Sequence, residues 1–68
     1  MKIKVFIERE NIKKDIEIKP DARIIDLLKL LKINPVTVIV SKNNKIVVEE
    51  TPIGNKDRIE IYSVVSGG

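Results

Sequence analysis

The sequence contains no cysteine and no histidine among its 68 residues. The absence of cysteine excludes disulfides, thiolate nucleophiles and cysteine metal sites. The absence of histidine removes the usual metal ligand and the usual general base near neutral pH. A serine or threonine nucleophile would then need a lysine base, and no motif places one. The sequence therefore argues against catalysis by the chain itself, and it gives no catalytic residues and no metal ligands.

Aromatic residues are also scarce, since Phe6 and Tyr62 are the only two. A chain that is 43% hydrophobic must then build its core from Ile, Val and Leu, and its length allows one small domain. The net charge of +3 comes from charges of both signs mixed along the chain. No basic cluster is interleaved with aromatics, which argues against a nucleic-acid partner. No apolar run approaches a membrane span and the start lacks a signal peptide's apolar stretch, so we expect a soluble, cytoplasmic protein with no membrane partner.

Two alternating segments open the chain and predict a β-hairpin. Ile3, Val5 and Ile7 fall on one face of the first segment, as a strand with one buried side requires. Residues 9–11 form the turn, and the alternation resumes over residues 14–19.

A helical period begins after Pro20, which ends the second strand because it cannot donate to a sheet. Apolar residues then recur at i, i+3, i+4 and i+7, the stripe of an amphipathic helix; they are Ile24, Leu27, Leu28 and Leu31. Asp21 is the candidate cap at the start of the helix. Ile25 and Leu30 fall outside the stripe, which predicts partial exposure. Asn34–Pro35 closes the helix, because proline disfavours helical geometry in the residue before it.

The second half of the chain predicts further strands. Residues 36–40 are all β-branched, which favours a more buried central strand. A turn over residues 42–45, with two asparagines that tolerate left-handed geometry, leads to a short strand over 46–48. A loop over residues 51–57 precedes the last strand, over residues 58–64.

The loop and the last strand contain the remaining predicted core residues. Ile53 is expected to turn inward from the loop, and Asp57 to stabilise the turn before the last strand. Ile59 and Ile61 are expected to face the core. The whole pattern predicts an α+β fold in the order ββαββ, with a mixed sheet of four or five strands and one helix packed on one face.

The sequence finishes with two consecutive glycines. We divide the chain into a folded domain over residues 1–63 and a flexible tail over 64–68. Two glycines leave no side chain near the last carboxylate, so such a tail can thread a narrow channel in another protein. The alternative is a frayed end that happens to be glycine-rich, because chain ends are often loosely held.

The element order, the length and the diglycine end together resemble the ThiS/MoaD family of ubiquitin-like β-grasp sulfur carriers, over the whole chain. The resemblance is most specific over residues 24–28, 38–47 and 57–68, and the Val-Val-Ser-Gly-Gly finish is closer to ThiS. The sequence also departs from the family pattern. Lys56 precedes Asp57 where members often have glycine, and Arg23 stands where a threonine or serine usually opens the helix.

The resemblance implies a function for the tail. A ubiquitin-activating-type adenylyltransferase, similar to ThiF or MoeB, would use ATP to adenylate the carboxylate of Gly68, and a sulfur donor would replace AMP to give a thiocarboxylate. A downstream synthase would receive the sulfur for thiamin, molybdopterin or thiolated tRNA, and no cofactor would be bound by the carrier. Gly67 and Ser66 would thread the enzyme's channel. The residues expected to contact the partner are Val65, Val64, Tyr62 and Phe6.

Two alternatives stay open from the sequence. One is a ubiquitin-like modifier joined through Gly68 to lysines of target proteins, because adenylation comes first in both chemistries and only the acceptor differs. The other is a β-grasp interaction or RNA-binding module of the TGS type, in which the glycine end is incidental.

Overall fold

The computed structural model describes residues 1–64, so the predictions for Val65, Ser66, Gly67 and Gly68 lie outside the described residues. The elements follow one another as β1 (Lys2–Ile7), the 3-10 turn η1 (Glu8–Glu10), β2 (Ile12–Glu17), α1 (Ile24–Leu30), the 3-10 turn η2 (Pro35–Thr37), β3 (Val38–Lys42), β4 (Lys45–Val47) and β5 (Arg58–Ser63). The predicted α+β arrangement of a mixed sheet and one helix is confirmed. None of the helices between residues 1 and 64 has the length and apolar content to cross a membrane.

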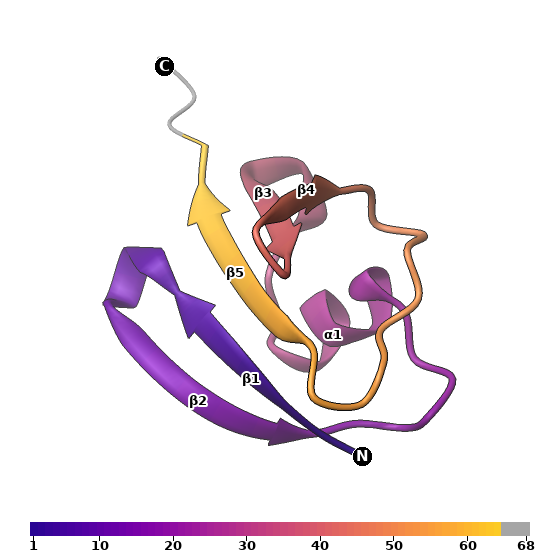
Figure 1. The fold of residues 1–68 in the computed structure, drawn as a ribbon. Helices are drawn as coiled ribbons and strands as arrows, with labels where there is room; N and C mark the ends of the chain where they lie inside the picture. The colour runs from indigo at the N-terminus through magenta and orange to yellow at the C-terminus, as the bar shows by residue number, and fades with distance from the viewer. Residues whose placement is uncertain (65–68) are drawn as a thin grey trace.

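The five strands form one sheet in the order β2-β1-β5-β3-β4, and α1 covers one of its faces (Figure 1). β1 and β5 run parallel, whereas β1–β2, β3–β5 and β3–β4 are antiparallel. The last strand is therefore the central one, with a hydrogen-bonded neighbour on each side.

The predicted strand over residues 36–40 is present as the interior strand β3, but its predicted start is wrong. Residues 35–37 form η2 instead, and the Val36 side chain is 85% exposed. The cause is local, because the Asn34 side chain accepts a hydrogen bond from the Val36 N–H at 3.0 Å and Pro35 fixes a turn-compatible φ. The strand begins only at Val38, beside the central β5.

The two predicted hairpins are present with shifted ends. β2 begins at Ile12, two residues before the predicted start, and ends at Glu17. Asn11 precedes it in the left-handed region with a φ of 52°. In the second hairpin Asn43 and Asn44 have φ values of 52° and 71°, the geometry of a type I′ turn, which matches the twist of the flanking strands.

The apolar stripe of α1 is confirmed. Ile24, Leu27 and Leu28 are buried, Leu31 packs partly against the core, and Leu30 is exposed as predicted. The stripe packs against the inward residues of β1, β3 and β5 in one core, completed by Ile18, Ala22 and Ile53; the inward residues are Ile3, Val5, Ile7, Val40, Ile59 and Ile61.

α1 begins at Ile24, the first residue of the predicted stripe, but the predicted cap is wrong. The N-cap is Arg23, and Asp21 lies two residues before it. The Arg23 backbone N–H donates to Asp26 Oδ2 at 2.9 Å. The first helical N–H groups donate to loop carbonyls, Ile24 to Thr51 and Ile25 to Glu49. The loop after β4 thus supplies the acceptors that a side-chain cap would otherwise provide.

The helix also ends earlier than predicted, at Leu30 rather than at Asn34–Pro35. Lys32 has a φ of 60°, and the Ile33 N–H donates back to the Leu28 carbonyl at 2.9 Å. This is the Schellman arrangement, in which a residue in the left-handed region terminates the helix. Glycine is usual at that position, so a sequence with lysine there gives no signal that the helix ends.

Lys32→Gly is expected to raise the free energy of unfolding by about 0.5–1 kcal/mol. The left-handed region costs a non-glycine residue about 1–2 kcal/mol, and the greater freedom of glycine in the unfolded chain removes roughly half of that gain. Urea unfolding would measure the change. Lys29→Gly, inside α1, is the matched control and should lower stability by about 1 kcal/mol. Equal losses in both variants would contradict the assignment of Lys32 as the helix terminator.

Candidate functional site

The candidate site is the end of β5, where the described chain leads toward the glycines. β5 ends at Ser63, and the Val64 N–H donates to the Thr37 carbonyl at 2.9 Å. The backbone is therefore held beside η2 for one residue beyond the strand. Figure 1 shows β5 in the middle of the sheet, running from the loop after β4 toward the C-terminal end of the chain.

Apolar side chains gather on the outer face of the sheet around this end of β5. Tyr62 lies directly opposite Ile39 of β3, and Ile46 of β4 lies opposite Ser41 on the same face. Ile39, Tyr62 and Val64 are all exposed, and Ile46 is 77% exposed. We call Ile39, Ile46, Tyr62 and Val64 the apolar surface. It is formed by three strands and lies on the face that α1 leaves uncovered.

The structure brings together only part of the predicted contact set. Tyr62 and Val64 belong to the apolar surface, whereas Phe6 is only half-buried and lies one strand away, on β1 and opposite Glu60. Phe6 faces away from Ile3, Val5 and Ile7, as predicted. Ile39 and Ile46 were not among the predicted contacts, because only the pairing of β3 with β5 and β4 places them beside Tyr62.

The Tyr62 phenol stays protonated at neutral pH. Local desolvation raises its pKa above the ordinary value, and the neighbouring carboxylates of Glu60 and Glu8 raise it further. Glu60 itself accepts a hydrogen bond from Ser41 Oγ at 3.0 Å. The phenol therefore presents a neutral hydrogen-bonding group next to the aliphatic side chains of the apolar surface.

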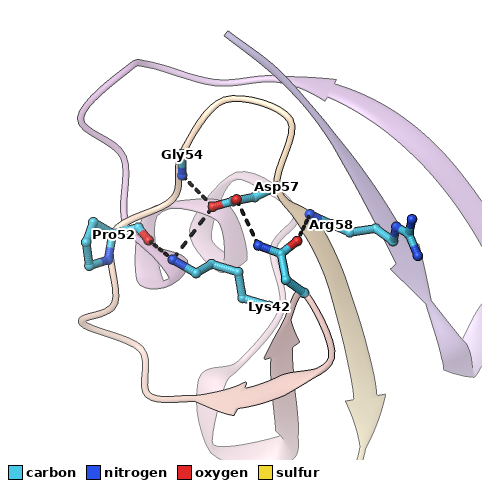
Figure 2. A network of polar contacts seen from close by, with 6 residues as sticks. Lys42, Pro52, Gly54, Asp57 and Arg58 are labelled. Carbon is cyan, nitrogen blue, oxygen red and sulfur yellow. Dashed lines mark hydrogen bonds and ion pairs between the residues drawn. The ribbon is translucent and has the colours of Figure 1, made fainter.

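The opposite end of β5 is fixed by a polar network around Asp57 (Figure 2). Asp57 Oδ2 accepts a hydrogen bond from the Gly54 N–H at 2.6 Å, and Asp57 Oδ1 accepts one from Asn43 Nδ2 at 3.0 Å. Asn43 Oδ1 in turn accepts from the Arg58 N–H at 3.0 Å. The first residue of β5 is thus tied both to its own loop and to the β3–β4 turn, which confirms the predicted role of Asp57.

Lys42 completes the network from β3. Its Nζ donates to the Pro52 carbonyl at 3.0 Å and lies 3.7 Å from Asp57 Oδ2 (Figure 2). Partial burial raises the pKa of the Asp57 carboxyl. The hydrogen bonds from Gly54 and Asn43 and the charge of Lys42 outweigh that effect, so the pKa lies below its ordinary value of 3.8.

Asp57→Asn is expected to lower stability at pH 7 by about 1–3 kcal/mol, because charge-assisted hydrogen bonds are lost from a side chain that is only 16% exposed. Folding lowers the pKa of the Asp57 carboxyl, so its ionised form stabilises the fold at pH values above the unfolded-state pKa, near 3.8. This stabilisation is lost as the pH falls through the lower pKa of the folded state. Urea midpoints at neutral pH and below pH 3 should therefore differ more in the wild type than in the variant.

The control for this prediction is Asp21→Asn, at an exposed aspartate. It should change the free energy of unfolding by less than about 0.5 kcal/mol. A variant at Asp57 with the wild-type pH dependence would show that the network does not stabilise the ionised carboxylate.

A model of the ThiS family matches residues 3–68 of the chain. The chain belongs to the ThiS family. Its sequence is 29% identical over 56 residues to a sulfur carrier protein, TtuB, of Thermus thermophilus, covering 82% of this chain and 86% of that protein.

Solved structures show the fold of this ThiS-family chain. The crystal structure of SAMP1 from Haloferax volcanii has a TM-score of 0.76 at 16% identity, and the match covers all of both chains. A ubiquitin-like protein from Caldiarchaeum subterraneum has a TM-score of 0.65 at 16% identity, with 98% of this chain and 100% of that one covered. The fold is therefore ubiquitin-like, the β-grasp arrangement that the sequence predicted.

The two departures from the family pattern have structural explanations in this ThiS-family chain. Lys56 has a φ of 67°, in the left-handed region that glycine adopts most easily. At Arg23, the Asp26 carboxylate accepts from the N-cap backbone, and the Arg23 guanidinium donates to the Glu50 carbonyl at 2.9 Å. Both positions keep the expected backbone geometry with different side chains.

Over residues 1–64, His, Cys, Asp and Glu side chains form no group of three or more that could hold a metal ion. What this part of the ThiS-family chain does provide is a well-anchored strand that ends beside an apolar surface. Such an arrangement can present a chain end to another protein.

Proposed function

We propose that the chain is a sulfur carrier whose Gly68 carboxylate is adenylated and then converted to a thiocarboxylate. The observation that carries the proposal is the ThiS-family match, which extends through residue 68 and so includes both glycines. The similarity to a sulfur carrier protein of Thermus thermophilus supports it. In this proposal the chain is a substrate in the cytoplasm and binds no cofactor of its own.

The chemistry explains why activation must come first. A carboxylate is a poor electrophile, because its charge is delocalised and oxide is a poor leaving group. Attack of the Gly68 carboxylate on the α-phosphorus of ATP forms an acyl adenylate and releases pyrophosphate. A donor of sulfur at the oxidation level of hydrosulfide then attacks the carbonyl carbon through its sulfur, the bond to AMP breaks with its electron pair leaving on AMP, and loss of the sulfur-bound proton gives the thiocarboxylate. The chain's own contribution is access to its carboxylate, since Gly67 carries no side chain beside it.

Both the tail and the apolar surface would contact the activating enzyme. Residues 64–68 would span roughly 16 Å when fully extended, enough to enter a recessed active site while the folded body stays outside. We place the body's contacts on Val64, Tyr62 and the neighbouring Ile39 and Ile46, with Val65 continuing them. Exposed apolar residues around a functional segment are typical of protein interfaces. Phe6 contributes from the adjacent strand.

The partners follow from this chemistry. An adenylyltransferase of the ThiF or MoeB type supplies the bound ATP, a sulfur donor supplies the sulfur, and a downstream synthase of thiamin, molybdopterin or tRNA thiolation receives it. A conjugating role as a ubiquitin-like modifier would use the same adenylate with a lysine amine as the acceptor. The carrier and modifier roles therefore differ only after activation.

Intact-mass measurement tests the proposal. The chain is incubated with the ThiF- or MoeB-like enzyme of its source organism, ATP and a sulfur donor. Its mass should rise by about 16 Da, the difference between sulfur and oxygen, because one carboxylate oxygen is replaced. Omission of ATP is the control and should leave the mass unchanged. An unchanged mass in the complete reaction, while the enzyme releases pyrophosphate from ATP, would contradict the sulfur-carrier assignment, and branched diglycine peptides on other proteins would indicate the modifier role.

A further inference from the structure

A hollow of about 470 Å³ lies on the outer face of the sheet, away from the end of β5. Its walls come from three strands. β1 contributes Lys4 and Phe6, β2 contributes residues 13–15, and β5 contributes residues 58–60. The hollow therefore lies over the half of the sheet formed by β1, β2 and the start of β5, beside the apolar surface rather than within it.

Strand register brings positive side chains together in this hollow. Lys4 lies opposite Arg58 across the parallel β1–β5 pair, and Phe6 lies opposite Lys13 across β1–β2. Because side chains alternate along a strand, all four share the outer face. Lys14 also lines the hollow, but it lies opposite the buried Val5, so its side chain belongs to the other face of the sheet. Three basic side chains therefore share the outer face with two acidic ones, Asp15 and Glu60.

These cations are not neutralised by ion pairs in the part of the chain that the structure covers. Between residues 1 and 64, the ion pairs join the amino terminus to Glu17 and Lys42 to Asp57. Asp15 lies directly across from Lys4, yet the two make no ion pair, and Glu60 accepts from Ser41 instead. Figure 2 shows the Arg58 side chain extending away from the Asp57 network, toward the neighbouring strand.

We propose that this hollow is a docking site for an acidic segment of a partner protein, a short peptide stretch with Asp or Glu beside an apolar side chain. The three cations Lys4, Lys13 and Arg58 would bind its carboxylates, and the half-buried Phe6 ring would contact its apolar side chain. This site does not depend on the tail chemistry, because its three cations take no part in the contacts proposed for the activating enzyme and only Phe6 is common to both.

The lining favours a peptide over the other anionic macromolecules. A nucleic-acid backbone carries a negative charge at every phosphate, so Asp15 and Glu60 would repel it along its length. A peptide also carries N–H donors, which these two carboxylates can accept. Stacking on a single strand usually involves several aromatic platforms, whereas Phe6 is the only aromatic residue in the hollow.

Amide chemical shifts of the ¹⁵N-labelled full chain provide the test. The probe is a synthetic peptide of alternating Glu and Leu, and the same peptide with Gln for Glu is its neutral control. At about 50 mM salt, the acidic peptide should shift residues 4–6, 13–15 and 58–60, and the neutral peptide should not. At about 1 M salt the shifts should disappear, because the screening length falls to about 3 Å.

A pair of matched variants measures the contribution of charge. Lys4→Gln with Arg58→Gln should weaken binding of the acidic peptide about fivefold, as expected for two solvent-exposed ion pairs. Lys29→Gln with Lys32→Gln, on the α1 side, removes the same net charge and should leave the affinity unchanged. A cooperative thermal unfolding transition in each double variant would show that it is folded.

Several outcomes would overturn the docking site. Equal losses in the two double variants would show that only net charge matters, as would shifts spread over lysines throughout the chain. Tighter binding of oligouridylate than of the peptide at the same residues would make it a nucleic-acid site. Concentration-dependent shifts of these residues without peptide would mean that a second copy of the chain occupies the hollow. Loss of peptide binding leaves the mass assay of the tail unaffected, so this site and the proposed function can fail separately.

Discussion

Removal of Gly67 and Gly68 should abolish the ATP-dependent mass increase while leaving the thermal unfolding midpoint unchanged. The described fold makes its contacts between residues 1 and 64, and the last of them is the hydrogen bond from Val64 to Thr37. The truncated chain should therefore keep its core and its apolar surface. It would present a serine carboxylate, two residues nearer to the folded body, which is too short by about 7 Å to reach the same point in a partner. Intact mass and circular dichroism on one sample measure both results.

Gly68→Ala is the graded control for this truncation. It keeps the carboxylate and the length of the tail and adds one methyl group beside the reacting carbon. The mass increase should still occur, but more slowly than in the wild type, because the partner's channel must accommodate a side chain. A truncated chain that supports its biological process at the wild-type level would instead favour the interaction module with an incidental glycine end.

Ile59→Ala should destabilise the fold by about 2–5 kcal/mol, the usual range for deleting this much buried side chain. Ile59 has 0% of its surface exposed and lies on β5, the central strand. A chain of 68 residues has a total stability of roughly 3–10 kcal/mol. The loss is therefore a large fraction of the total, and no disulfide exists to compensate for it. Urea unfolding should show a much lower midpoint, or no folded baseline at all.

Ile46→Ala is the matched control, because it makes the same chemical change at a side chain that is 77% exposed on β4. Its free energy of unfolding should change by less than about 0.5 kcal/mol. Similar losses at the two positions would contradict the placement of β5 at the centre of the core. The comparison also separates stability from docking, since Ile46 belongs to the apolar surface.

The elements that were predicted correctly are those with a local periodic signal. Ile3, Val5 and Ile7 recur at every second position, and the stripe of α1 repeats every three or four positions, so the buried faces of both elements followed from the sequence. The two asparagines at the β3–β4 turn are also a local signal, because their side chains tolerate positive φ.

The errors arose where backbone geometry is imposed by residues distant in sequence or by an atypical side chain. Lys32 terminates α1 in a conformation usually given to glycine, so it carried no stop signal. The start of α1 uses the carbonyls of Glu49 and Thr51, which lie more than twenty positions along the chain. The strand predicted from Val36 onward begins two residues later, because Asn34 and Pro35 form a turn first.

In the candidate site, too, the residues with a local signal were predicted and those placed by strand pairing were not. Tyr62 and Val64 were predicted from their place before the glycines, and the structure puts both on the exposed face. Ile39 and Ile46 could not be predicted, because their position beside Tyr62 depends on the register of β3 with β5 and β4. Asp57 was predicted to stabilise its own turn, but its bond to Asn43 required knowledge of the distant hairpin.

The central position of β5 also determines how the molecule responds to mechanical load. A partner that pulls on the carboxyl end draws β5 along its own axis, between β1 on one side and β3 on the other. Such a force shears both ladders, so their hydrogen bonds resist together instead of opening one at a time from an edge. The folded domain can therefore resist unfolding while a partner holds and pulls its carboxyl end.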